Sequence, residues 1–210
     1  MDGAPLLETL INGVPQSIGT SDYLQVNGET VTAPFVYGTM TTFTSVKAGV
    51  QSLVARDDLG YAVGPLKTPS LSGGQKYTLI VVGSFPKYSV LVFEEPASTG
   101  KAMLSFYEAS PSVPQAAFGS FDAASSSDFK QLGSGKLGTV TTVSVGAKVR
   151  NFGGYVGPAS KPYGSQTPAQ INAYDRHNEL PFHAIQRLSL FLFDTNTASS
   201  VGPVFGSLDR

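Results

Sequence analysis

Asp175, His177 and Glu179 are the residues whose types and spacing come closest to a metal-binding pattern. In an extended strand alternate residues project from the same face, so these three side chains would point together toward a divalent cation. The run that contains them is the most polar in the chain, and the sequence offers no fourth ligand. We therefore interpret it as a solvated loop and predict no metal site. A metal-dependent hydrolase centred on His177 is kept as an alternative hypothesis.

Nucleophilic hydrolysis would need an exposed serine with a histidine and an acid arranged behind it. The chain has two histidines, His177 and His183, and no Gly-x-Ser-x-Gly sequence. It has no cysteine, which excludes disulfides, a thiolate nucleophile and cysteine-bound zinc. Glu94 and Glu95 are adjacent, and adjacent strand residues point to opposite faces, so they cannot flank one glycosidic bond. We predict that the protein is not an enzyme and uses no cofactor.

Tyr155, Tyr163 and Tyr174 are the one group of side chains that suggests recognition. They lie in or beside a long Gly/Pro/Tyr segment, residues 151–172, that has little periodicity. Long irregular loops within compact domains are often functional, and tyrosines there can stack on sugars or anchor a protein. The alternative is that the three rings shield the open end of a core from water. Both interpretations stay open.

Charge and hydropathy exclude two classes of partner. The net charge is −1 and no Lys/Arg cluster exists, so nucleic-acid binding is not expected. No apolar run approaches the roughly 20 residues that span a bilayer, and we predict no transmembrane segment. The first residues lack the basic and apolar regions of a secretion signal, so any export signal is expected outside this sequence.

The composition and the spacing of short apolar runs predict an all-β protein. There are 23 Gly and 14 Pro, and 14% of the residues are charged, against about 25% in typical domains. Residues 77–82 form an apolar run bounded by turn residues, which predicts a buried strand, and residues 88–93 would return antiparallel. Asn27-Gly28 predicts a tight hairpin turn. Pro65 and Pro69 cannot donate ladder hydrogen bonds, so their region should be an edge or a loop.

Parts of the second half repeat the first in the same order. Residues 38–42 recur as residues 138–142, and the apolar run 77–82 has a counterpart of equal length in 188–193. A Pro/Gly/Ser-rich linker at 96–100 is typical of a domain boundary. One larger sandwich whose halves pair along a common sheet is the alternative. We predict two tandem antiparallel β-sandwich domains of immunoglobulin- or transthyretin-like type, at residues 1–97 and 98–210.

An ordered set of turn and core-strand motifs runs through the first half: Asn12-x-x-Pro15, Asn27-Gly28, Tyr37-Gly38, Lys47-Ala-Gly49 and Gly74-Gln-Lys-Tyr-Thr-Leu-Ile-Val-Val-Gly83. Together these motifs resemble one bacterial family, the domain-of-unknown-function family numbered 4397. The resemblance covers about residues 6–112, and the second half has Ile185-Gln-Arg-Leu188 where the first has a Gly-x-x-Tyr sequence.

The resemblance implies an exported or surface-anchored β module, often a lipoprotein, without an established activity. We therefore predict a non-enzymatic module with a structural or adhesion role. Its location would be extracellular, periplasmic or at the cell surface, and its partner would be a cell-surface glycan or protein. The alternative is a carbohydrate- or protein-binding module that uses Tyr155, Tyr163 and Tyr174.

Overall fold

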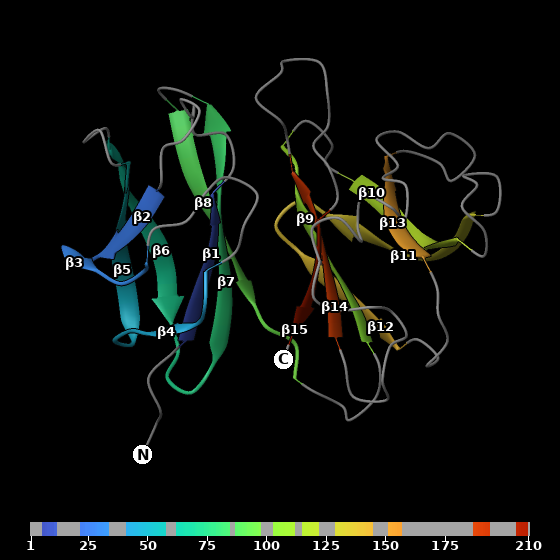
Figure 1. Cartoon of the computed structure of the whole chain (residues 1–210), viewed down its shortest axis with the longest axis horizontal. Coiled ribbons are helices and arrows are strands. Elements are labelled where there is room, and N and C mark those ends of the chain that lie inside the picture. The colour runs from blue at the N-terminus through green and yellow to red at the C-terminus, as the bar shows by residue number, and fades with distance from the viewer. Residues whose placement is uncertain are drawn as a thin grey trace. The chain divides into compact units, whose positions relative to one another are not determined.

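The elements of this protein are strands, which confirms the all-β prediction (Figure 1). The chain divides into two compact units, Met1–Glu95 (unit 1) and Pro96–Arg210 (unit 2). The computed structural model describes these residues: 6–11, 22–33, 41–57, 62–84, 87–97, 103–111, 115–121, 129–144, 151–156, 187–193 and 205–209.

The first sheet of unit 1 has the strand order β4-β1-β7-β8. Its strands are β1 (Leu6–Ile11), β4 (Thr44–Ser45), β7 (Lys76–Ser84) and β8 (Lys87–Glu94). The apolar run expected at residues 77–82 lies in β7, and β8 returns antiparallel to it, as predicted. β1 pairs with β7 in parallel, so the sheet is mixed rather than purely antiparallel. Side-chain periodicity predicts strands but not their partners, which is why the sequence missed this pairing.

The second sheet of unit 1 has the strand order β3-β2-β5-β6. Its strands are β2 (Asp22–Val26), β3 (Glu29–Thr30), β5 (Gly49–Asp57) and β6 (Ala62–Leu71). Asn27 and Gly28 join β2 to β3 with φ angles of 51° and 90°. Two positive φ angles in a two-residue loop are the geometry that Asn-Gly favours, which confirms the predicted hairpin.

The prolines also lie where the sequence predicted them. Pro65 and Pro69 are both in β6, which pairs with β5 alone within the described residues and ends the sheet order. An edge strand has one side without a partner strand, and a proline whose nitrogen faces that side costs no hydrogen bond of the sheet. The strand therefore tolerates both prolines.

The core of unit 1 lies between its two sheets. Buried side chains from β2, β5 and β7 belong to one hydrophobic cluster with partly buried side chains of β8 packed against it. Leu24, Leu53 and Leu79 are each no more than 1% exposed. Tyr77 brings its ring into the same cluster, and its hydroxyl accepts a hydrogen bond of 3.0 Å from the backbone N–H of Ser72.

We expect Tyr77→Phe to destabilise unit 1 by about 1 kcal/mol. The substitution keeps the ring in the core and removes the acceptor of the Ser72 N–H. Urea denaturation followed by tyrosine fluorescence measures the loss. Tyr23→Phe is the control, because the Tyr23 hydroxyl makes no hydrogen bond within the described residues, and its effect should stay within about 0.5 kcal/mol. Equal effects of the two substitutions would contradict the assigned role.

Unit 2 contains a four-stranded sheet with the order β12-β9-β14-β15 and a three-stranded sheet with the order β11-β10-β13. The strands of the first are β9 (Met103–Ala109), β12 (Val140–Ser144), β14 (Arg187–Phe193) and β15 (Phe205–Asp209). The strands of the second are β10 (Gln115–Phe121), β11 (Phe129–Lys136) and β13 (Asn151–Val156).

The four-stranded sheet of unit 2 repeats the pairing of β4-β1-β7-β8. β9 pairs antiparallel with β12 and parallel with β14, as β1 does with β4 and β7. β14 then pairs antiparallel with β15, as β7 does with β8. The two apolar runs that the sequence analysis compared, in β7 and β14, therefore occupy the same place in their sheets.

An aromatic stack joins the two sheets of unit 2. Phe106 of β9 and Phe118 of β10 lie with ring centroids 4.8 Å apart and planes at 11°. Both rings are 0% exposed. Gly133 and Gly135 of β11 lie against them, because a Cβ at Gly133 would come 2.7 Å from Phe118 Cζ and one at Gly135 would come 2.9 Å from Phe106 Cδ1. The core of unit 2 is thus built on rings that pack directly against glycine backbone.

Candidate functional site

The predicted site residues of the second half fall mostly outside the described residues. Tyr163 and Tyr174 lie there, as do Asp175, His177, Glu179 and His183. Tyr155 is described and lies in strand β13, where its backbone pairs with Ala117 of β10. The segment expected to be an irregular loop from residue 151 thus begins with a strand. A ligand-binding role for the three tyrosines stays a prediction.

The part of the chain that the structure describes contains no cluster of three or more His, Cys, Asp or Glu side chains placed to hold a metal ion. It also contains no helix long and apolar enough to cross a membrane. Exposed surfaces among the described residues are further functional candidates.

The outer face of the β3-β2-β5-β6 sheet is the richest such surface. Strand side chains alternate between faces, and Leu24 and Leu53 point into the core. Their neighbours therefore point outward, where Tyr23 of β2 pairs with Arg56 of β5. We call this surface the Tyr23–Arg56 face and define it by its outward residues: Tyr23, Gln25, Thr30, Val50, Ser52, Val54, Arg56 and Lys67.

Three polar side chains on this face form a hydrogen-bonded line across three strands. The Arg56 Nε–H donates to Gln25 Oε1 at 3.0 Å, and Gln25 Nε2 donates to Thr30 Oγ1 at 3.5 Å. Arg56 and Gln25 are half-buried, and Thr30 is exposed. The Arg56–Gln25 bond orients the guanidinium beside Tyr23, which lowers the entropy that a ligand would have to remove from this long side chain.

The side-chain amides of Asn27 and Gln51 form a pair that connects the turn after β2 to β5. Asn27 Nδ2 donates to Gln51 Oε1 at 2.8 Å, and the Ser52 N–H donates to Asn27 Oδ1 at 2.9 Å. Gln51 Nε2 donates to the carbonyl oxygens of Lys47 and Gly49, each at 2.8 Å. Gln51 is only 1% exposed, so these bonds lie within the fold and hold the turn after β2 against β5.

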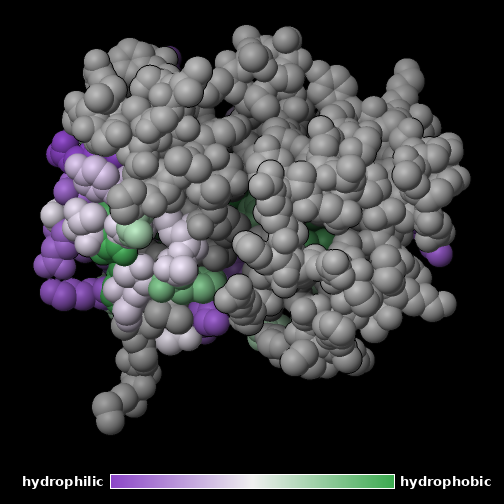
Figure 2. Space-filling view, in the orientation of Figure 1, coloured by the Kyte–Doolittle hydropathy of each residue, from purple (hydrophilic) through white to green (hydrophobic). Residues whose placement is uncertain are grey.

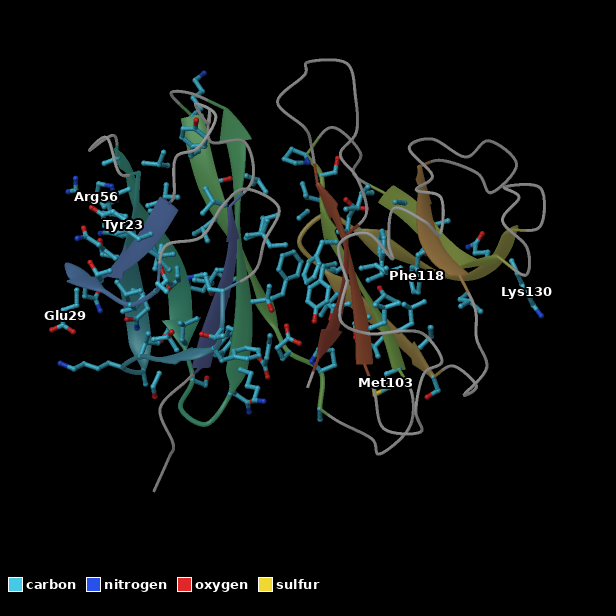
Figure 3. The ribbon with its side chains drawn as sticks, in the orientation of Figure 1. Tyr23, Glu29, Arg56, Met103, Phe118 and Lys130 are labelled. Atoms are coloured by element: carbon cyan, nitrogen blue, oxygen red, sulfur yellow. The ribbon has the colours of Figure 1, made fainter. Side chains whose placement is uncertain are left out.

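The charges on the face are mostly positive. Arg56 contributes one cation, and Lys67, which pairs with Ser52 in the β5–β6 ladder, contributes a second. Glu29 stands at the β3 edge of the sheet, and Figure 3 shows it at a different place from Tyr23 and Arg56, whose labels lie together. Figure 2 shows hydrophilic residues gathered over the side of unit 1 that carries β2, β3 and β5.

The chemistry of these groups is binding rather than proton or group transfer. A guanidinium stays charged and carries five fixed N–H donors, so it recognises planar anions and exchanges no proton near neutral pH. A tyrosine ring offers a flat apolar surface with a polar tip. Val50, which is 57% exposed, adds apolar area on the same face. Together these groups form a contact surface with a cation, an aromatic ring and an apolar side chain.

None of the residues of this face was predicted as a site from the sequence. The pairing of Tyr23 with Arg56 joins residues far apart in the chain and depends on the register of β2 on β5. That register is a property of the folded sheet and has no local signature in the sequence.

Comparison with known families gives one match. Residues 9–119 match the model of DUF4397, a domain of unknown function. The matched residues run past the end of unit 1 at Glu95 and include β9 and most of β10. No curated protein matches the chain.

Two solved bacterial structures are similar over nearly the whole chain. One is the family CBM26 carbohydrate-binding module CBMbc of Amy13K from Eubacterium rectale, in complex with maltoheptaose, with a TM-score of 0.28 and 11% identity over 98% of this chain and 96% of that chain. The other is the fimbrial anchor protein Mfa2 from Porphyromonas gingivalis, with a TM-score of 0.26 and 8% identity over 97% of each chain.

Proposed function

We propose, from the premise that the chain belongs to the DUF4397 family, that it is a non-enzymatic adhesion module that acts outside the cytoplasm. It would serve in the extracellular space, in the periplasm or at the cell surface, as the family resemblance implies. In this proposal each unit is a β-sandwich, and the two units form a tandem that displays binding surfaces on a rigid scaffold.

The repeated strand pairing supports the tandem. The sheet that contains β1 and β7 and the sheet that contains β9 and β14 have the same order and the same mixture of parallel and antiparallel pairs. In each unit buried side chains from both sheets meet, around Leu79 in unit 1 and at the Phe106–Phe118 stack in unit 2. Two packed sheets around one core are what a sandwich requires.

The single observation that carries the adhesion role is the Tyr23–Arg56 face. The tyrosine and the arginine of this face are residue kinds enriched at the centres of binding surfaces. They are direct cross-strand partners in a sheet rather than loop residues. A surface of this kind needs no catalytic group to serve its role.

Cell binding by the purified full chain tests this proposal. The labelled protein should bind bacterial surfaces saturably in flow cytometry, and the double variant Tyr23→Ala/Arg56→Ala should lose most of that binding. Lys130→Ala is the matched control, since Lys130 is an exposed cation on β11 of the other unit and its loss should leave binding unchanged. Protease shaving of the producing cells, expected to release the protein, tests the location.

Two results would overturn the proposal. One is undiminished cell binding by the double variant, which would remove the face from the adhesive role. The other is protection of the native protein from shaving and from periplasmic extraction, which would place it in the cytoplasm.

A further inference from the structure

We propose that the Tyr23–Arg56 face binds an acidic saccharide, a chain of linked uronic acid residues. This inference rests on the proposed adhesion role and names the ligand class of the same surface. The carboxylate of one sugar would lie on the Arg56 guanidinium, and the ring of that sugar or its neighbour would lie on the ring of Tyr23.

The Arg56 guanidinium is the group that would bind the carboxylate. Within the described residues its one hydrogen bond runs from Nε to Gln25, at 3.0 Å. The two Nη groups carry the other four of the five donors and are the pair that can bind both oxygens of a carboxylate. The bond to Gln25 orients the guanidinium before the ligand arrives, and the exposed Gln25–Thr30 contact, at 3.5 Å, is the longer of the two. Bidentate binding of this kind selects a carboxylate over a hydroxyl.

The neighbours of Arg56 on this face would bind the sugar ring and its hydroxyl groups. Tyr23 is the direct cross-strand partner of Arg56, and residues opposite each other in an antiparallel ladder have Cβ atoms about 5 Å apart. A half-buried tyrosine ring at that distance offers a surface on which the C–H face of a sugar can lie. Thr30 and Ser52, both outward on the same face, place hydroxyl groups where sugar hydroxyls would need partners.

Lys67 is the second cation of the face. It pairs with Ser52, which lies four residues before Arg56 along β5. At about 3.3 Å per residue the backbone positions of Lys67 and Arg56 are offset by about 13 Å along the strand direction, on the neighbouring strands β6 and β5. A polyuronate carries one carboxylate on every sugar, so it can meet both cations, whereas a neutral saccharide gains nothing from either.

Other macromolecules fit this surface less well. Peptides are recognised at sheet edges, in grooves or by arginine clusters, and this face has a single arginine, on β5, which is paired on both sides. Nucleic acids need several clustered cations, and the face as defined carries two, Arg56 and Lys67. A linear saccharide with spaced carboxylates is the ligand whose shape and charge match the face.

Calorimetric titration of the full chain with tri-galacturonic acid tests the inference. We expect saturable binding that weakens as salt is raised, and no binding of the methyl ester, which has the same rings without the charge. Arg56→Ala and Tyr23→Ala should each lower the affinity at least about tenfold. Tyr23→Phe should recover part of the affinity lost in Tyr23→Ala, because it restores the ring. Lys130→Ala, on unit 2, should bind as the wild type does.

The outcomes separate this inference from the proposed function. Equal binding of the acid and its ester, of polyglutamate and the saccharide, or of wild type and Arg56→Ala would overturn it. Cell binding that persists while tri-galacturonic acid fails to bind would leave the adhesion role standing and reject the ligand class. Thermal unfolding of each variant shows that a lost affinity does not come from a lost fold.

Discussion

Replacing Phe118 with alanine is expected to destabilise unit 2 by about 3–5 kcal/mol, the usual cost of truncating a buried phenylalanine. Phe118 is 0% exposed and stacks on Phe106 at 4.8 Å, so its loss empties the centre of the core. Hydrogen exchange of the amides in β9 and β10 measures the effect within unit 2. Differential scanning calorimetry measures the change in unfolding temperature of the whole chain.

A sharper test of the same packing is the pair of Phe118 and Gly133. A methyl group at Gly133 would come 2.7 Å from Phe118 Cζ, and the stack on Phe106 limits how far that ring can move away. Gly133→Ala alone should therefore cost about 1–3 kcal/mol. In a Phe118→Leu background the ring tip is gone, and the same change should cost much less.

The double-mutant cycle of Gly133→Ala and Phe118→Leu should thus show a coupling free energy of about 1 kcal/mol or more. Ser134→Ala is the control, because Ser134 is the exposed neighbour of Gly133 on β11, and its effect should stay within about 0.5 kcal/mol. Equal costs of Gly133→Ala in both backgrounds would mean that the ring does not fill the space the structure assigns to it.

The glycines of this protein fall into two kinds. The role of Gly28 follows from its local turn and can be predicted from the sequence, whereas the roles of Gly133 and Gly135 depend on packing against distant residues. Asn27-Gly28 was readable because the turn needs two positive φ angles, and those residues supply them without help from the rest of the fold. The strand at residues 77–82 was readable because its composition alone demands burial. Gly133 and Gly135 gave no such signal, since the rings that require them come from other strands.

The same division explains the candidate site. The density of tyrosines and polar residues drew the sequence analysis to the second half, where a single residue, Tyr155, lies within the described strands. The Tyr23–Arg56 face depends on how β2 registers on β5, and its members are individually ordinary strand residues. Parallel pairing of β1 with β7 was missed for the same reason. Pairing between distant strands is decided by the whole core, not by local propensity.

Gln51→Leu is expected to destabilise unit 1 by about 2–4 kcal/mol, although leucine is the more hydrophobic residue at a buried position. The side chain of Gln51 bonds Asn27 and the carbonyl oxygens of Lys47 and Gly49, all at 2.8 Å. Leucine would leave a donor and two acceptors without the partner they have now. The loss of three hydrogen bonds, at about 1 kcal/mol each, outweighs what the extra apolar contact returns.

Gln75→Leu is the matched control for this substitution. It makes the same chemical change at an exposed glutamine before β7, and its effect should stay within about 0.5 kcal/mol. Urea denaturation of both variants measures the difference. Asn27→Gly removes the other amide while keeping a residue that tolerates the φ of 51°, and it should couple to Gln51→Leu by about 1 kcal/mol.

The amide pair also contacts the binding face, since Asn27 Oδ1 accepts from the backbone N–H of Ser52, which is an outward residue of β5 next to Gln51. If the pair holds β2 and β5 in register, Gln51→Leu should weaken tri-galacturonic acid binding even under conditions where the variant remains folded. Unchanged affinity in a destabilised variant would show instead that the network stabilises unit 1 without ordering the face. A loss of both stability and affinity in Gln51→Leu would indicate that the amide pair maintains the register of β2 on β5, which places Tyr23 beside Arg56.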